Sequence, residues 1–153
     1  MANTAIKICD RIINYSFYLL FVLVPIIFIP FNFELFEFNK MWLTYILTIV
    51  IMASWLVKMV LQGEIKIQRT PLDIPILLFL SANIISTIFS IDVHTSLWGY
   101  YSRFNGGLLS VVSYILLYFA FINNMARKEE VVKILLISLV TGALVAFYGV
   151  LEH

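Results

Sequence analysis

The sequence predicts an all-α integral membrane protein, a polytopic bundle of about five transmembrane helices with a cytoplasmic N-terminus. Of its 153 residues, 62% are hydrophobic and 12% are charged, and the mean hydropathy is +0.99. Soluble domains are roughly 45–50% apolar and about 25% charged. With about half the usual charge, this chain cannot cover its surface with polar groups, so we expect its excess apolar surface to face lipid.

Five segments predict helices that form a single transmembrane domain over residues 1–153. Crossing about 30 Å of hydrocarbon takes about 20 residues at 1.5 Å each. Short polar connections join the apolar segments, as they join consecutive antiparallel helices. The predicted helices cover residues 12–31, 41–61, 72–91, 107–122 and 131–151.

The first and third predicted helices have local sequence signals. The first segment is longer than the 7–15-residue apolar stretch of a signal peptide, and no small-residue cleavage site follows it. We therefore expect a retained signal anchor, kinked at Pro25 because proline lacks a backbone donor. Pro71 and Pro75 predict the first turn of the third helix, where a missing N–H costs little.

The basic residues predict the orientation. Of the ten Lys and Arg residues, Lys40 and Arg103 lie in the first and third connections, and the other eight lie on the N-terminal side. Because positive charge marks the cytoplasmic side, residues 32–40 and 92–106 are expected outside. The eight are Lys7, Arg11, Lys58, Lys66, Arg69, Arg127, Lys128 and Lys133.

Polar residues share one face of the third predicted helix and one face of the fourth. They either hydrogen-bond between helices, at about 0.6 kcal/mol per contact, or line a cavity. We favour packing, because none of them ionises near neutral pH. On the fifth helix, Gly142, Ala146 and Gly149 are expected to let a neighbouring helix approach closely. The polar residues are Asn83, Ser86, Thr87 and Ser90, then Ser110, Ser113, Tyr114 and Tyr118.

Several functions are disfavoured by the sequence. The net charge of +1 and the absence of a Lys/Arg-rich run give no reason to expect nucleic acid as a partner. Cys9 is the single cysteine, so it has no partner for an internal disulfide and no metal-ligand companion. No metal-ligand spacing and no nucleotide-binding motif occurs, so no metal or other cofactor is expected.

The connection between the third and fourth helices contains the candidate functional residues. Arg103 offers a planar fork of donors that suits phosphate oxygens. Together these residues could hold a phosphate-bearing or sugar-bearing ligand at the outer face. In the equally weighted alternative, the segment is a structured re-entry loop, Arg103 pairs with Asp92 or a lipid phosphate, and the aromatic rings anchor the membrane interface. The candidates are Asp92, His94, Trp98, Ser102 and Arg103.

The same segment carries a recognisable pattern. It reads Ser90-Ile91-Asp92, then Ser96-Leu97-Trp98-Gly99-Tyr100-Tyr101-Ser102-Arg103, then Gly106-Gly107-Leu108-Leu109. The pattern resembles the first third of the O-antigen ligase and O-antigen polymerase family. The similarity extends over Leu72–Leu151, and it departs from the family at Val93, where proline is common, and at Asn105, where glutamine is common.

The resemblance implies a bacterial inner-membrane protein of ten or more helices. Such proteins transfer or polymerise glycans carried on undecaprenyl diphosphate at the outer face, without a nucleotide sugar or an essential metal. Arg103 is the position to which a substrate-contact role is carried over. The chain ends at His153, directly after an apolar stretch, and we expect it to be the N-terminal part of a longer, inverting glycosyltransferase. The alternative is a non-enzymatic membrane protein, such as part of a transporter or flippase.

Overall fold

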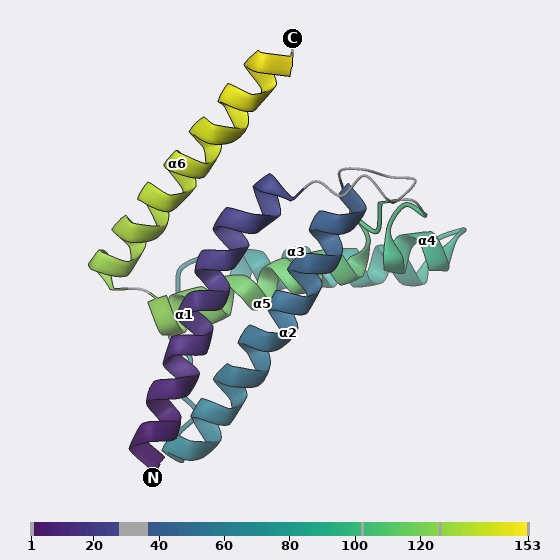
Figure 1. The fold of residues 1–153 in the computed structure, drawn as a ribbon. Helices are drawn as coiled ribbons and strands as arrows, with labels where there is room; N and C mark the ends of the chain where they lie inside the picture. The colour runs from purple at the N-terminus through teal and green to yellow at the C-terminus, as the bar shows by residue number, and fades with distance from the viewer. Residues whose placement is uncertain (1, 28–36, 102, 126, 153) are drawn as a thin grey trace.

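The computed structural model describes residues 2–27, 37–101, 103–125 and 127–152. Within these ranges every regular element is a helix, which confirms the predicted all-α class. The chain order is shown in Figure 1. The helices are α1 (Ala2–Ile26), α2 (Glu37–Gln62), α3 (Asp73–Ile88), α4 (Val93–Trp98), α5 (Leu108–Met125) and α6 (Lys128–Glu152).

The helices α1 and α2 form an antiparallel pair that holds most of the packed core (Figure 1). Ile13 and Phe17 of α1 and Ile51 and Trp55 of α2 are almost completely buried in one cluster. In lipid, such contacts stabilise through van der Waals packing rather than through removal from water, because the surrounding acyl chains are equally apolar.

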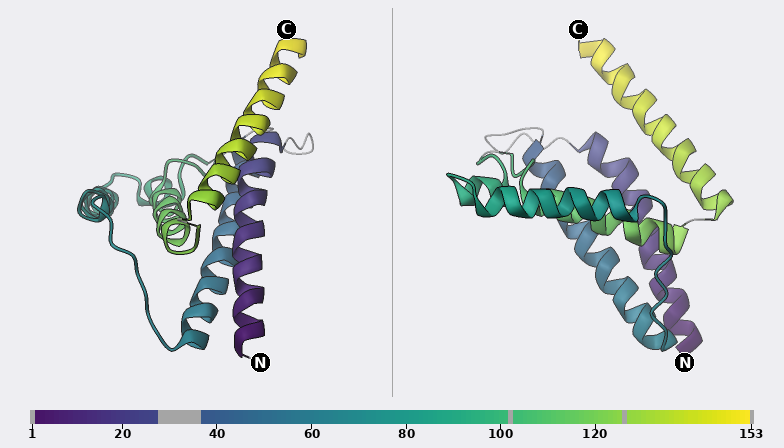
Figure 2. Two further views of the ribbon diagram at one scale, coloured as in Figure 1. Left: turned by 90° about the vertical axis from the view of Figure 1, so that its left-hand side faces the viewer. Right: turned by 180° about the vertical axis from the view of Figure 1, so that it is seen from behind.

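The helices α3 and α5 lie side by side and cross the α1–α2 pair obliquely (Figure 2). Leu117 and Ala120 of α5 join the core cluster. Thr70 ties the start of α3 to α5, since its hydroxyl lies 2.9 Å from the Tyr118 hydroxyl and donates to Asp73 at 2.6 Å. The short helix α4 follows α3 and returns the chain to the start of α5.

The last helix, α6, packs against α1 and reaches beyond its end (Figure 1). The Tyr18 hydroxyl donates to Glu130 Oε2 at 2.6 Å, which joins α1 to the first turn of α6. Gly142 and Gly149, which we predicted to pack closely, have open space where a Cβ would stand. The predicted helix contact at this face is therefore not made by the described residues.

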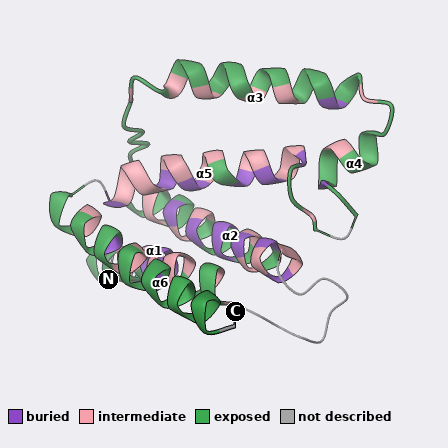
Figure 3. Cartoon of the chain, turned by 90° about the horizontal axis from the view of Figure 1, so that it is seen from above, coloured by how far each residue is buried: buried purple, intermediate pink, exposed green. Residues whose placement is uncertain are grey.

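Large apolar side chains cover the outside of the fold. Figure 3 shows that exposed residues predominate on α3 and α6 and recur along the outer faces of the other helices. Within the described residues, four helices are long and apolar enough to cross a membrane. The chain is therefore a helical membrane protein. The four segments are Asn3–Ile26, Glu37–Gln62, Leu108–Met125 and Lys128–Leu151.

Several predicted helix boundaries differ from the structure. The segment predicted as a third span at 72–91 is the 16-residue helix α3, about 24 Å long and shorter than the hydrocarbon core. It ends at Ile88 because Ser90 and Asp92 start a new turn that leads into α4. The first helix begins at Ala2 rather than residue 12, and it ends at Ile26, so Pro25 lies in its last turn.

Two of the four polar residues predicted on one face of the third helix, Asn83 and Thr87, and one of the four on α5 bond to the backbone of their own helix. Thr87 Oγ1 donates to Asn83 O at 2.8 Å, and Ser113 Oγ donates to Leu109 O at 2.9 Å. The other three residues of the α5 stripe contact different elements. Tyr118 contacts Thr70, which precedes α3. Ser110 and Tyr114 contact Tyr45 and Met41 of α2, as expected for interhelical hydrogen bonding. Local bonds of this kind let hydroxyls sit in an apolar helix without lining a cavity.

Candidate functional site

The candidate site is built on a tight loop between α4 and α5. Gly99 has φ +87°, a conformation that L side chains rarely adopt, and a Cβ there would come within 3.0 Å of the Asn105 backbone. A Cβ on Gly107 would come equally close to the backbone of Leu97, Trp98 and Gly99. In the loop, Gly99 of the Trp-Gly pair and Gly107 of the Gly-Gly pair therefore each let two backbone segments approach closely.

Phe104 holds this loop against the start of α2. Its carbonyl oxygen accepts a hydrogen bond of 2.8 Å from the Tyr45 hydroxyl, and its own φ is +51°. Its ring meets Phe38 and Trp98 in edge-on contacts, with centroid distances of 5.5 and 6.3 Å. Such pairs contribute about 0.5–1.5 kcal/mol beyond their burial. The aromatic residues of the loop thus fix its backbone to a membrane-spanning helix.

Arg103 lies next to Phe104 and pairs with Glu37 on the first turn of α2. Its Nη1 is 3.7 Å from Glu37 Oε1, and the two side chains are 55% and 43% exposed. Ion pairs this exposed contribute about 0–1 kcal/mol. The pair with Glu37 is therefore weak by itself, and an anionic ligand that offers a bidentate partner would compete with Glu37 for the guanidinium.

A polar pocket of about 470 Å³ opens beside this ion pair. Its lining includes a guanidinium, a carboxylate, a phenol and an amide, which together can bind an anionic group and several hydroxyls. The lining residues are Glu37, Tyr100, Arg103, Asn105 and Gly106.

Asp92 and His94 lie outside this pocket. The Asp92 carboxylate caps α4, accepting from the Thr95 amide at 3.2 Å and from the Thr95 hydroxyl at 2.5 Å. These hydrogen bonds lower the pKa of Asp92 because they favour its charged form. His94 is exposed on α4. Arg103 is paired with Glu37 rather than with Asp92, so the structure does not bring the three predicted charged residues together.

The two remaining predicted residues are Trp98 and Ser102. Trp98 is 41% exposed and supports the loop through its ring contact with Phe104. Ser102 lies outside the described residues. Of the five predicted residues, Arg103 alone is part of the pocket lining that the structure describes.

Sequence reasoning missed Glu37 and Tyr45. Glu37 precedes the apolar segment that predicted the second helix, but the helix extends back to include it in the first turn, where an acidic side chain is favoured. Tyr45 lies in the apolar segment of the second predicted helix, and its hydroxyl donates to Phe104 O and lies 3.3 Å from Ser110 Oγ. The sequence signal that could have identified Glu37 is its position as an acidic residue just before an apolar segment.

Comparisons with protein-family models, with curated proteins and with solved structures found no match. The fold and the apolar helices define the class, a helical membrane protein. Within the described residues, the candidate chemistry lies in the loop between α4 and α5 and in the pocket beside Arg103.

Proposed function

We propose that this chain is the N-terminal membrane portion of an O-antigen ligase-like or O-antigen polymerase-like protein of the bacterial inner membrane. Such a protein would transfer or polymerise undecaprenyl-diphosphate-linked glycans at the outer face, in lipopolysaccharide or other cell-envelope polysaccharide biosynthesis. The observation that supports this proposal best is Arg103, presented at a polar pocket of about 470 Å³ by the loop that carries the Trp-Gly and Gly-Gly pattern.

The reaction we propose is an inverting glycosyl transfer. An acceptor hydroxyl attacks the anomeric carbon, the bond to the diphosphate oxygen breaks, and the polyprenyl diphosphate leaves with the electron pair. Arg103 would bind diphosphate oxygens and stabilise the charge that develops on the leaving group. Glu37 would release the guanidinium at little cost, because their ion pair is exposed.

Other groups of the reaction are proposed to come from elsewhere in a longer protein. Asp92 is committed to capping α4, and neither Asp92 nor His94 lines the Arg103 pocket. We therefore propose that the catalytic base, which takes the proton of the acceptor hydroxyl, and the main diphosphate clamp lie in another part of the full-length protein.

The proposal is tested by substituting Arg103 in the full-length protein and measuring glycan transfer. Arg103→Ala should reduce transfer by about 10- to 100-fold, since a hydrogen bond to a charged group contributes about 1.5–3 kcal/mol. Arg103→Lys should restore transfer only in part, because lysine keeps the charge but lacks the planar fork.

The matched control is Lys40→Ala, which removes the other basic residue on the predicted outer side. Lys40 does not line the Arg103 pocket, so transfer should stay near the parental level. Membrane insertion of each variant is measured in parallel. Full transfer by a correctly inserted Arg103→Ala protein would remove Arg103 from the site.

A second candidate function, part of a transporter or flippase, is favoured by a different observation. Lys58 and Asp10 form an ion pair of 2.6 Å within two helices long enough to span the membrane. Charged residues inside spanning helices often mark substrate or ion paths. The double variant Asp10→Asn/Lys58→Met separates the two candidates: it should abolish transport by a transporter but leave glycan transfer intact in a transferase.

A further inference from the structure

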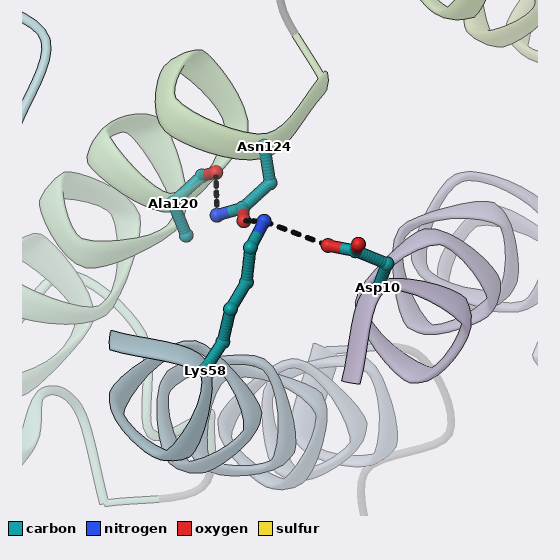
Figure 4. A network of polar contacts seen from close by, with 4 residues as sticks. All are labelled: Asp10, Lys58, Ala120 and Asn124. Carbon is teal, nitrogen blue, oxygen red and sulfur yellow. Dashed lines mark hydrogen bonds and ion pairs between the residues drawn. The ribbon is translucent and has the colours of Figure 1, made fainter. Parts of the chain in front are cut away.

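A second polar pocket lies where α1, α2 and α5 meet, away from the Arg103 loop. Lys58 of α2 stands at its centre, with Nζ 2.6 Å from Asp10 Oδ1 and 2.9 Å from Asn124 Oδ1. Figure 4 shows Lys58 reaching between the two other helices, with Asn124 turned so that its amide nitrogen donates to Ala120 O at 2.9 Å. The cavity has a volume of about 370 Å³.

The position of the pocket places it at headgroup depth. Lys58 lies one helical turn before the end of α2 at Gln62, about 6 Å along the axis. The connection that follows carries Lys66 and Arg69, and Arg127 directly precedes α6. Polar connections and basic residues at this end mark the level where spanning helices leave the hydrocarbon for the headgroups.

Two donors at the pocket make no hydrogen bond with the described residues, although the charge of Arg127 acts on Glu130. Asn14, one turn after Asp10 on α1, lines the cavity, and its amide makes no hydrogen bond within the described part of the chain. Arg127 is exposed at the rim, and its guanidinium likewise makes no hydrogen bond or ion pair with a described residue. A third donor is available because the Lys58 ammonium has three N–H groups, two of which serve Asp10 and Asn124.

The charges around the cavity suit an anion of unit charge. Lys58 and Arg127 supply two positive charges, and Asp10 supplies one negative charge, which leaves a net charge of +1 at the pocket. A lipid phosphodiester carries one negative charge and presents two free oxygens. Basic pockets between helices on this side of a membrane are suited to acidic headgroups.

We propose that this pocket binds the phosphate of an anionic phospholipid from the leaflet on the N-terminal side. Arg127 holds the phosphate oxygens through its fork of donors, and Asn14 and Lys58 donate from inside the cavity. Asp10 holds the Lys58 ammonium in place and keeps the pocket from accumulating excess positive charge. The proposal is independent of the function proposed for the Arg103 site.

The experiment measures lipid binding to the purified chain in detergent by native mass spectrometry. Phosphatidylglycerol is titrated against phosphatidylcholine, and a parallel arm adds inorganic phosphate. Phosphatidylglycerol should bind preferentially. Arg127→Gln should weaken the binding of phosphatidylglycerol about fivefold, because one basic residue at a membrane surface contributes about 1 kcal/mol. Asn14→Leu should weaken it without any change in charge.

The matched control is Lys66→Gln, which removes one positive charge on the same side. Lys66 is exposed, forms an ion pair with Glu64 and does not line the pocket, so its loss should change lipid binding far less. Because Arg127 is exposed, its substitution is not expected to disturb folding.

Three outcomes would overturn the proposal. Equal weakening by Arg127→Gln and Lys66→Gln, with none from Asn14→Leu, would mean diffuse attraction to a basic surface. Displacement of the lipid by inorganic phosphate at equal concentration would identify a site for a soluble phosphate instead. Equal binding of phosphatidylglycerol and phosphatidylcholine would remove the acidic headgroup as the ligand.

Discussion

The tightest backbone approach in the described fold gives the sharpest prediction. Gly107→Ala adds one methyl group at a position where the backbone of Leu97, Trp98 and Gly99 lies within 3.0 Å of the new Cβ. These neighbours are main-chain atoms, which cannot rotate away as a flexible side chain can. The substitution must therefore shift the loop that carries Arg103 away from the start of α5.

The magnitude follows from two opposing terms. Overpacking a well-packed position costs about 1–3 kcal/mol, and contact with the main chain places this substitution in the upper half of that range. Replacing glycine by alanine also restricts the unfolded chain, which returns about 0.4–1 kcal/mol. We expect a net destabilisation of about 1–2.5 kcal/mol.

Two other glycines separate steric from conformational effects. Gly106 has φ +82° but open space around its Cβ position, so Gly106→Ala tests backbone strain alone, at about 1–2 kcal/mol. Gly142 lies inside α6 and also faces open space, so Gly142→Ala should stabilise by about 0.5–1 kcal/mol. The apparent melting temperatures of the three variants in detergent rank their stabilities. A Gly107→Ala protein as stable as Gly142→Ala would refute the close approach.

Two further predictions concern the α1–α2 pair and the orientation of the chain. Asp10→Asn should destabilise by about 1–2 kcal/mol, because Lys58 is 17% exposed and would lose its charged partner, whereas Lys58→Met should cost less, because Asp10 is 43% exposed and can be hydrated. A double-mutant cycle by thermal unfolding should show coupling, and strictly additive effects would contradict the ion pair. For orientation, His94→Cys should react with an impermeant maleimide added from outside, and Lys66→Cys should react only after permeabilisation. The opposite pattern would reverse the assigned sides, and the burial of Cys9 keeps the background low.

Hydropathy was sufficient to locate the helices because lipid exposure requires long apolar segments. It placed the ends poorly, since a helix continues through polar residues such as Lys7 and Asp10 when its backbone bonds are satisfied. It also merged α3 with the turn after it. The capping pair Asp92 and Thr95, three residues apart, was the local signal that a new helix starts at Val93.

The candidate site could be found only in part from the sequence. Arg103 is distinctive because the predicted outer side has few basic residues, but its partner Glu37 lies on a different helix, and no local pattern connects them. Gly106 and Gly107 entered the sequence analysis only as part of the family pattern. In the structure, Gly107 lets two parts of the backbone come together, and Gly106 lines the pocket.

The Lys58–Asp10 pair bears on how the chain enters the membrane during synthesis. A charged residue costs about 2.5–3.5 kcal/mol at the centre of an inserting helix and less near the end, where Lys58 lies, and a partner already in place reduces that penalty further. Asp10 belongs to α1, which is synthesised before α2. The Asp10 carboxylate is therefore already present when Lys58 enters the membrane with α2. Asn124 follows 66 residues later and completes the site. The first two helices can thus insert as a hairpin in which Lys58 is already paired, and the later helices can assemble on it.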